Sequence, residues 1–158
     1  MNKSTKSARS YLFVPANRTE RFEKALSTQA DAVIIDLEDA VPPELKISAR
    51  ESLKVWLADH PNHHIMIRVN SAQTEWFKDD IQLTHFKNVQ AIVLPKTEFS
   101  AEIDSVLNIR PIDIFPLIET PLGLANVRKI AQAISIPDFM YGSIFFHLEK
   151  NMQGGNLE

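Results

Sequence analysis

Short apolar runs recur along the chain, and this pattern constrains the fold more than any other feature. Several runs are rich in β-branched residues, and they begin at positions 11, 32, 65, 91, 114 and 139. Runs this short, bounded by polar segments, are typical of buried strands, since buried helices are longer. The predicted strands are 11–14, 32–36, 65–69, 91–94, 114–118 and 139–142.

Segments with helical spacing separate the runs. Asn17 is predicted to cap the first helix, with Glu20 as its capping-box partner. Thr120 followed by Pro121 predicts another helix start, because proline is favoured at the first helical position. Strands that are apolar on both faces and alternate with helices indicate the α/β class, with a parallel sheet covered by helices.

Two architectures fit this alternation: a doubly wound open sheet and a (β/α)₈ barrel. No strand is followed by a glycine-rich phosphate loop, so the nucleotide-binding open sheets lose support. A full barrel needs roughly 250 residues. A chain of 158 residues therefore predicts an incomplete barrel of about six βα units. Pro116, inside the fifth run, argues against a central strand because proline has no amide proton to donate.

Composition excludes several classes of protein. The chain is 44% hydrophobic with a net charge of −3, which suits a globular domain and gives no basic face for nucleic acid. It has no cysteine, so disulfides and cysteine-ligated metals are excluded. The first ten residues do not resemble a secretory signal, and no apolar run approaches the about 18 residues of a membrane span. The cytoplasm is the expected compartment.

Polar and charged side chains follow the first five predicted strands. The carboxyl ends of the strands carry the active site of a barrel, so we expect these side chains to converge on one rim. They are Asn17, Arg18 and Arg21 after the first strand, Asp36, Glu38 and Asp39 after the second, Arg68 and Asn70 after the third, Lys96 after the fourth, and Glu119 after the fifth.

The acids and Arg68 each allow two roles. Asp36 and Glu38 would share one face if the strand continues, which suits catalysis, but an acid cluster is also favourable before a helix. Arg68 could clamp a carboxylate or a thioester carbonyl. It could equally form a structural ion pair with the nearby acids, and both roles are compatible.

Glu119 and the early arginines are open in the same way. A carboxylate ending an apolar strand suits a hard cation such as Mg²⁺, and it also suits a salt bridge with Lys96 or Arg68. Arg18 and Arg21 lie at a helix start, where they could strengthen a phosphate site or lie on a mixed surface. Four histidines show no metal-ligand spacing with an acidic partner, and surface roles are expected for them: His60, His63, His64 and His85.

Taken together, these segments resemble the citrate lyase β-subunit (CitE-like) family of the HpcH/HpaI aldolase superfamily. The resemblance runs from about residue 9 to residue 143, in the family's order and spacing. The matching segments are 9–15 (RSYLFVP), 17–22 (NRTERF), 31–41 (DAVIIDLEDAV), 68–70 (RVN), 94–96 (LPK) and 116–120 (PLIET).

The resemblance implies a TIM-type barrel that cleaves 3-hydroxy-acyl thioesters with Mg²⁺, giving acetyl- or acyl-CoA and a 2-oxo acid. Partners would be a CoA or acyl-carrier thioester, further copies in a trimer or larger homo-oligomer, and other lyase subunits. By position, Arg68 and Asn70 would bind substrate, and Arg68 would be catalytic. Glu38 and Asp39 would be the catalytic acid pair that orders the rim around Arg68. Arg18 would lie near the CoA phosphates, and Glu119 would bind both metal and substrate.

Two features depart from the family pattern. Phe145 stands where the family has a second aspartate ligand for Mg²⁺, and a phenyl ring cannot bind a hard cation. The chain is also predicted to be a single, truncated barrel domain over 1–158, with 1–9 disordered and 147–158 as a tail. Two other functions therefore stay open: a catalytically silent relative that binds CoA or a partner, and an aldolase of free 4-hydroxy-2-oxo acids.

Overall fold

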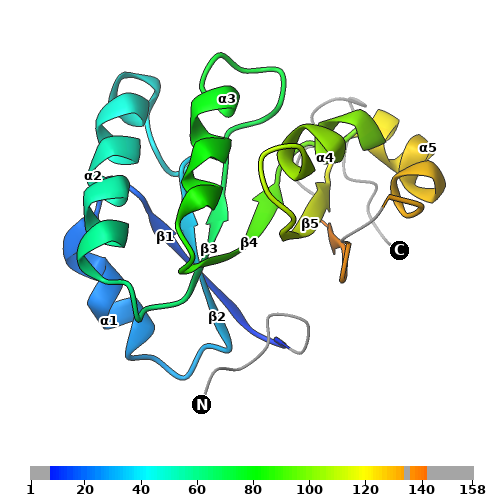
Figure 1. Ribbon diagram of the computed structural model, residues 1–158. Helices are drawn as coiled ribbons and strands as arrows, with labels where there is room; N and C mark the ends of the chain where they lie inside the picture. Colours follow the sequence, from blue (N-terminus) through cyan, green and yellow to red (C-terminus); the bar gives the residue numbers. More distant parts are fainter. Residues whose placement is uncertain (1–7, 134–135, 142–158) are drawn as a thin grey trace, which may run out of the picture.

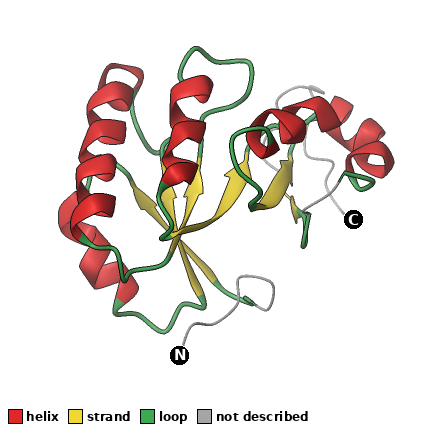
Figure 2. Ribbon diagram, viewed as in Figure 1, coloured by secondary structure: helices red, strands yellow, loops and turns green. Residues whose placement is uncertain are grey.

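A computed structural model describes residues 8–133 and 136–141 of the chain. Its centre is a six-stranded sheet in which all strands are parallel and neighbours in space are neighbours in sequence (Figures 1 and 2). This consecutive order is that of a barrel wall, whereas a doubly wound sheet reverses its order part-way. The strands are β1 (Tyr11–Pro15), β2 (Ala32–Asp36), β3 (Ile65–Arg68), β4 (Val89–Leu94), β5 (Asp113–Ile118) and β6 (Met140–Tyr141).

Helices cover one face of this sheet (Figure 2). Alternate strand residues such as Ile35, Ile67 and Ile92 point to that face and pack with Leu53 and Ile103 of the helices. The helices are α1 (Phe22–Leu26), α2 (Lys46–Asp59), α3 (Phe77–Asp80), α4 (Ser100–Leu107) and α5 (Pro121–Ile130), and short 3₁₀ helices lie at η2 (Thr19–Arg21), η3 (Pro43–Leu45) and η4 (Ile81–His85).

The other face of the sheet carries its own apolar cluster. Ile34, Met66, Val93 and Phe115 alternate with the helix-facing residues and are almost completely buried. Since β2 to β5 are buried on both faces, their sequences are nearly continuous apolar runs, which is why the runs predicted a parallel sheet. The predicted fold class, an incomplete barrel of six strands, is confirmed.

The predicted helix starts had mixed outcomes. Thr120 caps α5 as predicted, because its side-chain oxygen accepts a hydrogen bond from Gly123 N at 3.0 Å and Pro121 opens the helix. Asn17 as the cap of the first helix was wrong. The chain enters η2 at Arg18, with no capping bond from a side chain, and Asn17 Oδ1 is buried without a hydrogen-bond partner among the described residues.

Pro116 lies inside β5 after all, with Leu94 as its partner on β4. Leu117 accepts a hydrogen bond from Thr97 N at 3.2 Å on the β4 side. Consecutive strand residues turn their backbone groups to opposite sides, so the ring nitrogen of Pro116 faces the β6 side. Pairing on that side begins only at Leu117 with Met140, so no ladder hydrogen bond is lost.

Some predictions fall outside the described residues. These concern disorder at 1–9, described only from residue 8, and the tail at 147–158. Residue 142 of the sixth predicted strand and Phe145 lie there too. Within the described ranges, no helix has the length and apolar character needed to cross a membrane.

Candidate functional site

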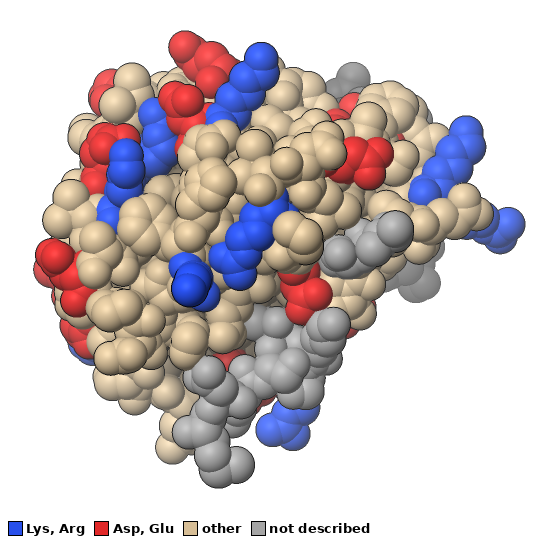
Figure 3. Space-filling view, viewed as in Figure 1, with Lys and Arg blue, Asp and Glu red and all other residues tan. Residues whose placement is uncertain are grey.

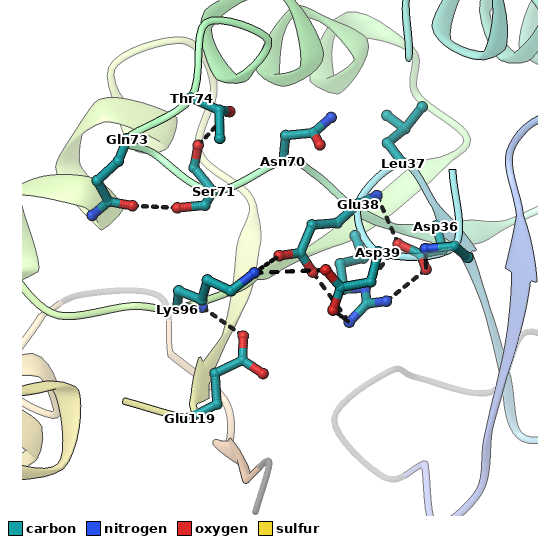
Figure 4. A network of polar contacts seen from close by, with 12 residues as sticks. Asp36, Leu37, Glu38, Asp39, Asn70, Ser71, Gln73, Thr74, Lys96 and Glu119 are labelled. Carbon is teal, nitrogen blue, oxygen red and sulfur yellow. Dashed lines mark hydrogen bonds and ion pairs between the residues drawn. The ribbon is translucent and has the colours of Figure 1, made fainter. Parts of the chain in front are cut away.

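Four of the predicted exit positions meet at one edge of the sheet. Asp36 ends β2 and lies in register with Arg68, which ends β3. Lys96 follows β4 and Glu119 follows β5, so the parallel strands bring all four to the same rim. Figure 4 shows Asp36, Glu38, Asp39, Lys96 and Glu119 in one connected set of polar contacts.

Arg68 is the most heavily bonded residue of this rim. Its Nε donates to Asp36 Oδ1 at 2.8 Å and its Nη2 to Asp36 Oδ2 at 2.6 Å, a two-point ion pair. Nη1 lies 3.2 Å from Glu38 Oε2 and 4.0 Å from Asp39 Oδ2. Burial alone would lower the pKa of Arg68, but the hydrogen bond and charge of Asp36 raise it. The predicted structural ion pair is therefore present.

Asp36 also shapes the turn that carries the other two acids. Its carboxylate accepts hydrogen bonds from Glu38 N at 2.8 Å and Ala40 N at 3.2 Å. Lys46 also stabilises this turn, because its Nζ donates hydrogen bonds to the carbonyl of Leu37 at 2.7 Å and to that of Glu38. Asp36 is thus more than one of several acids before a helix, because its carboxylate bonds to the backbone of the turn and to Arg68. Sequence reasoning missed Lys46, which has no distinctive motif.

Lys96 joins the acids of β2 to the acid of β5. Its Nζ donates to Glu38 Oε1 and lies 3.6 Å from Asp39 Oδ1, while its backbone N donates to Glu119 Oε1 at 2.9 Å (Figure 4). Burial would lower the pKa of Lys96, but the hydrogen bond to Glu38 raises it. The predicted salt bridge of Glu119 with Lys96 takes the form of a backbone hydrogen bond, while the ammonium pairs with Glu38.

Glu119 is nearly inaccessible, with 3% of its surface exposed. Burial, followed by the negative charge of Glu38, raises its pKa to about 7. Burial likewise raises the pKa of Glu38, against the opposing influence of Lys96 and Arg68. Both shifts come first from burial, which disfavours the charged carboxylate, and repulsion by a neighbouring carboxylate adds to each.

The rim has more acidic than basic side chains. Four carboxylates (Asp36, Glu38, Asp39 and Glu119) meet the two cations that bond to them, Arg68 and Lys96, and these six side chains have a net formal charge of −2 when all are ionised. Lys46 is a further cation near the acids, but its ammonium bonds to backbone carbonyls. Glu119 Oε2 accepts no hydrogen bond from any described residue. A buried carboxylate with one oxygen outside the hydrogen bonds, in a site with more acids than cations, fits a hard divalent cation that keeps several waters.

Within the described ranges, no three His, Cys, Asp or Glu side chains form a ready-made metal site. The predicted role of Glu119 as a Mg²⁺ ligand stays a prediction. Phe145, the position of the expected second ligand, lies outside the described residues.

Asn70 is drawn into a neighbouring network. Its backbone N and its Nδ2 both donate to Asp80 Oδ2, at 2.9 and 2.7 Å, and Arg50 Nη1 donates to Asp80 Oδ1 at 3.0 Å. Asp80 is completely buried. This network holds the loop after β3 in place. The predicted contact of Asn70 with substrate stays a prediction.

Arg18 and Arg21 lie apart from the bonded rim. Each is 3.9 Å from the carboxylate of Glu20, and their side chains are 55% and 60% exposed. They are accessible to a ligand, and the predicted contact of Arg18 with CoA phosphates stays a prediction. On the face shown in Figure 3, basic side chains lie among acidic ones and form no continuous basic surface.

Two histidines have an acidic neighbour that spacing did not reveal. His60 Nε2 and His63 Nε2 each lie 3.7 Å from a carboxylate oxygen of Glu23, and Trp56 stacks on both rings. The expectation concerned metal-ligand spacing and surface roles, and no group of three metal-ligating side chains is found among the described residues. Because Glu23 comes from α1 and the histidines follow α2, only packing of the two helices brings them together.

Comparison with protein families places this geometry in a known group. A model described as HpcH/HpaI aldolase/citrate lyase matches residues 9–142. A (3S)-malyl-CoA thioesterase of Cereibacter sphaeroides is 36% identical over 126 residues, covering 78% of this chain and 44% of the relative. A citrate lyase subunit beta-like protein of Deinococcus radiodurans is 32% identical over 154 residues, covering 90% and 54%. The chain spans about half the length of the curated relatives it matches.

Solved structures agree with the family match. The citrate lyase beta subunit of Mycobacterium tuberculosis, complexed with oxaloacetate and magnesium, superposes with a TM-score of 0.78 at 31% identity, covering 96% of this chain and 65% of that one. CitE of the same organism, in complex with magnesium, acetoacetate and coenzyme A, also gives 0.78 and 31%, covering 92% and 53%.

Proposed function

Because the chain belongs to the HpcH/HpaI aldolase/citrate lyase family, we propose that it carries the metal-binding rim of a Mg²⁺-dependent carbon–carbon lyase. The substrate class is a 3-hydroxy-acyl thioester such as citryl-, citramalyl- or malyl-CoA, and the products are an acyl-CoA and a 2-oxo acid. The observation that carries the proposal is the buried Glu119 in a rim with a net formal charge of −2. Relatives bound to magnesium and coenzyme A support the cofactor and the substrate class.

Each rim residue has a distinct part in such a cleavage. Glu119 Oε2 would hold Mg²⁺, whose contribution when bound is Lewis-acid polarisation of the oxygens of the 2-oxo acid moiety. Arg68 Nη1 supplies fixed positive charge where anionic character gathers as the carbon–carbon bond breaks. Asp36 holds the guanidinium so that this charge needs no reorganisation during the reaction.

A carboxylate must also take the proton of the substrate hydroxyl as it becomes a ketone. Glu38 is buried between Lys96 and Arg68, whereas the side chain of Asp39 is 47% exposed. Of the two predicted catalytic acids, Asp39 is thus the one able to reach a substrate, and Glu38 orders its neighbours. Arg18, exposed at the start of η2, is the proposed contact for the CoA phosphates.

The test is product analysis with Mg²⁺ and citryl-, citramalyl- and malyl-CoA. Cleavage should yield a 2-oxo acid, detectable with phenylhydrazine, and should be lost on chelation and in Glu119→Ala and Arg68→Ala. Activity that persists in both variants would contradict the assigned roles. Cleavage of free 4-hydroxy-2-oxo acids without CoA would favour the aldolase alternative, and Mg²⁺ and CoA binding without turnover the silent one.

A second candidate is thioester hydrolysis, which the malyl-CoA thioesterase relatives favour. Hydrolysis releases free CoA and an intact hydroxy acid, whereas the lyase releases an acyl-CoA and a 2-oxo acid. Thiol release measured beside 2-oxo acid formation therefore separates the two. Thiol without 2-oxo acid would make the chain a thioesterase.

A further inference from the structure

Lys96 has a backbone conformation that a side chain seldom adopts. Its φ is 50°, and it is the one residue other than glycine with a positive φ in the part of the chain that the structure describes. This left-handed region is unfavourable for a residue with a Cβ, and glycine or asparagine usually occupies it. Such strain persists only where the surrounding structure holds it, and it is frequent at functional sites.

Contacts with β4, β5 and the start of α5 hold the turn that carries Lys96. Thr97 N donates to Leu117 O at 3.2 Å and Thr97 Oγ1 to Leu94 O at 2.7 Å, which fixes the exit of β4. The start of α5 packs directly on this turn, since a Cβ at Gly123 would lie 2.4 Å from the carbonyl oxygen of Thr97. The conformation of Lys96 is therefore imposed by its neighbours.

In this conformation one residue holds two carboxylates that repel each other. The amide of Lys96 points to Glu119 Oε1 and the ammonium points to Glu38 Oε1 (Figure 4). The second oxygen of Glu38 accepts no hydrogen bond from the described residues, but it lies 3.2 Å from Arg68 Nη1, so a cation lies close to each of its oxygens. The amide, in contrast, engages one oxygen of Glu119 and leaves the other open.

We propose that Lys96 is a positioning residue that selects Glu119 and not Glu38 as the carboxylate presented to the divalent cation. This rests on the proposed function for the identity of the cation. An ordinary ion pair at this place would stabilise the turn without influencing metal binding. A selecting lysine instead competes with the metal for Glu38, and its removal opens a second carboxylate while the net formal charge of the rim falls from −2 to −3.

The test compares Lys96→Met and Lys96→Arg with Lys54→Met, in which an exposed lysine paired with Glu51 on α2 is lost. Isothermal titration with Mg²⁺ should show binding about tenfold tighter in Lys96→Met, because one opposing charge is gone. Turnover should fall, because Glu38 and Asp39 lose their anchor. Lys96→Arg, which keeps the charge, and Lys54→Met should stay within about threefold of the parent affinity. Unchanged affinity in Lys96→Met, or equal behaviour of the Arg and Met variants, would overturn the proposal.

A second experiment tests Lys96 without any metal. It applies even if the parent chain does not bind Mg²⁺, an outcome that would contradict the proposed cofactor. Thermal unfolding of Lys96→Met, Glu38→Gln and the double variant should be non-additive, whereas the Lys54→Met and Glu38→Gln pair should be additive. Lys96→Gly should unfold at a higher temperature than Lys96→Ala, because only glycine is relaxed at this φ. Additivity between positions 96 and 38 would refute the positioning role without reference to any metal.

Discussion

Replacing Glu119 by glutamine should make the protein more stable at alkaline pH. Glutamine keeps the side-chain oxygen that accepts from Lys96 N but cannot ionise. In the parent chain, the folded-state pKa of Glu119 is about 7, against an ordinary pKa of 4.5 for a glutamate. The stabilisation from the neutral acid is therefore complete below pH 4.5 and is lost as pH rises through 7.

The size of the effect follows from the same shift. A difference of 2.5 pH units (7 − 4.5) corresponds to about 3 kcal/mol of unfolding free energy between acid and alkaline conditions. For a chain of this length, that is about 6–12 °C in melting temperature. Glu119→Gln and the parent should thus differ by this much more at pH 8 than at pH 4.5.

Urea unfolding at a series of pH values, with the exposed Glu20→Gln as control, measures this difference directly. Mg²⁺ should stabilise the parent at pH 8 and leave the glutamine variant unchanged, since the cation offsets the buried charge. A stability difference between variant and parent that stays constant from pH 4.5 to 8 would refute the assignment of uncompensated charge to Glu119.

Three further changes test the surrounding structure. Arg68→Lys should lower kcat by at least about tenfold and the free energy of unfolding by about 1–3 kcal/mol, because lysine cannot bond both oxygens of Asp36. Steady-state rates and melting temperatures measure these losses, and values near those of the parent would contradict the prediction. Asp80→Asn should lower the free energy of unfolding by about 3 kcal/mol, because Arg50 loses its buried partner. In the same urea titration, the control Asp79→Asn, at an exposed position, should lower it by under about 1 kcal/mol, and equal losses would count against the Asp80 network. Arg18→Ala should raise KM for a CoA thioester several-fold and leave KM for its pantetheine analogue unchanged, and the reverse result would remove Arg18 from the phosphate site.

The oligomeric state predicted from the family resemblance stays a prediction. Phe13, whose ring lies under the Arg68 guanidinium at 5.1 Å, is 42% exposed on β1. Sedimentation velocity should show a trimer or larger species, and Phe13→Glu should dissociate it if this strand contributes to the interface. A compact monomer of the parent chain would contradict the expectation.

Local sequence determined the strands, because each is a short apolar run, and it determined the polar residues that follow them. Parallel pairing then requires those residues to lie at one edge, so the positions of Asp36, Arg68 and Glu119 on one rim could be predicted from the order of residues alone. The cap at Thr120 was equally local, since its bond reaches only to Gly123.

Tertiary structure decided how the charges are paired. Three features depend on contacts between separate strands and helices: the pairing of Arg68 with both oxygens of Asp36, the bonds of Lys46 to the acid turn, and the bonds of Lys96 to two carboxylates. The same holds for Glu23 beside His60 and His63, and for the backbone strain at Lys96 imposed by α5 and β5. Periodicity reports which face a residue takes, whereas hydrogen-bond geometry and burial are set by neighbours that are distant in sequence.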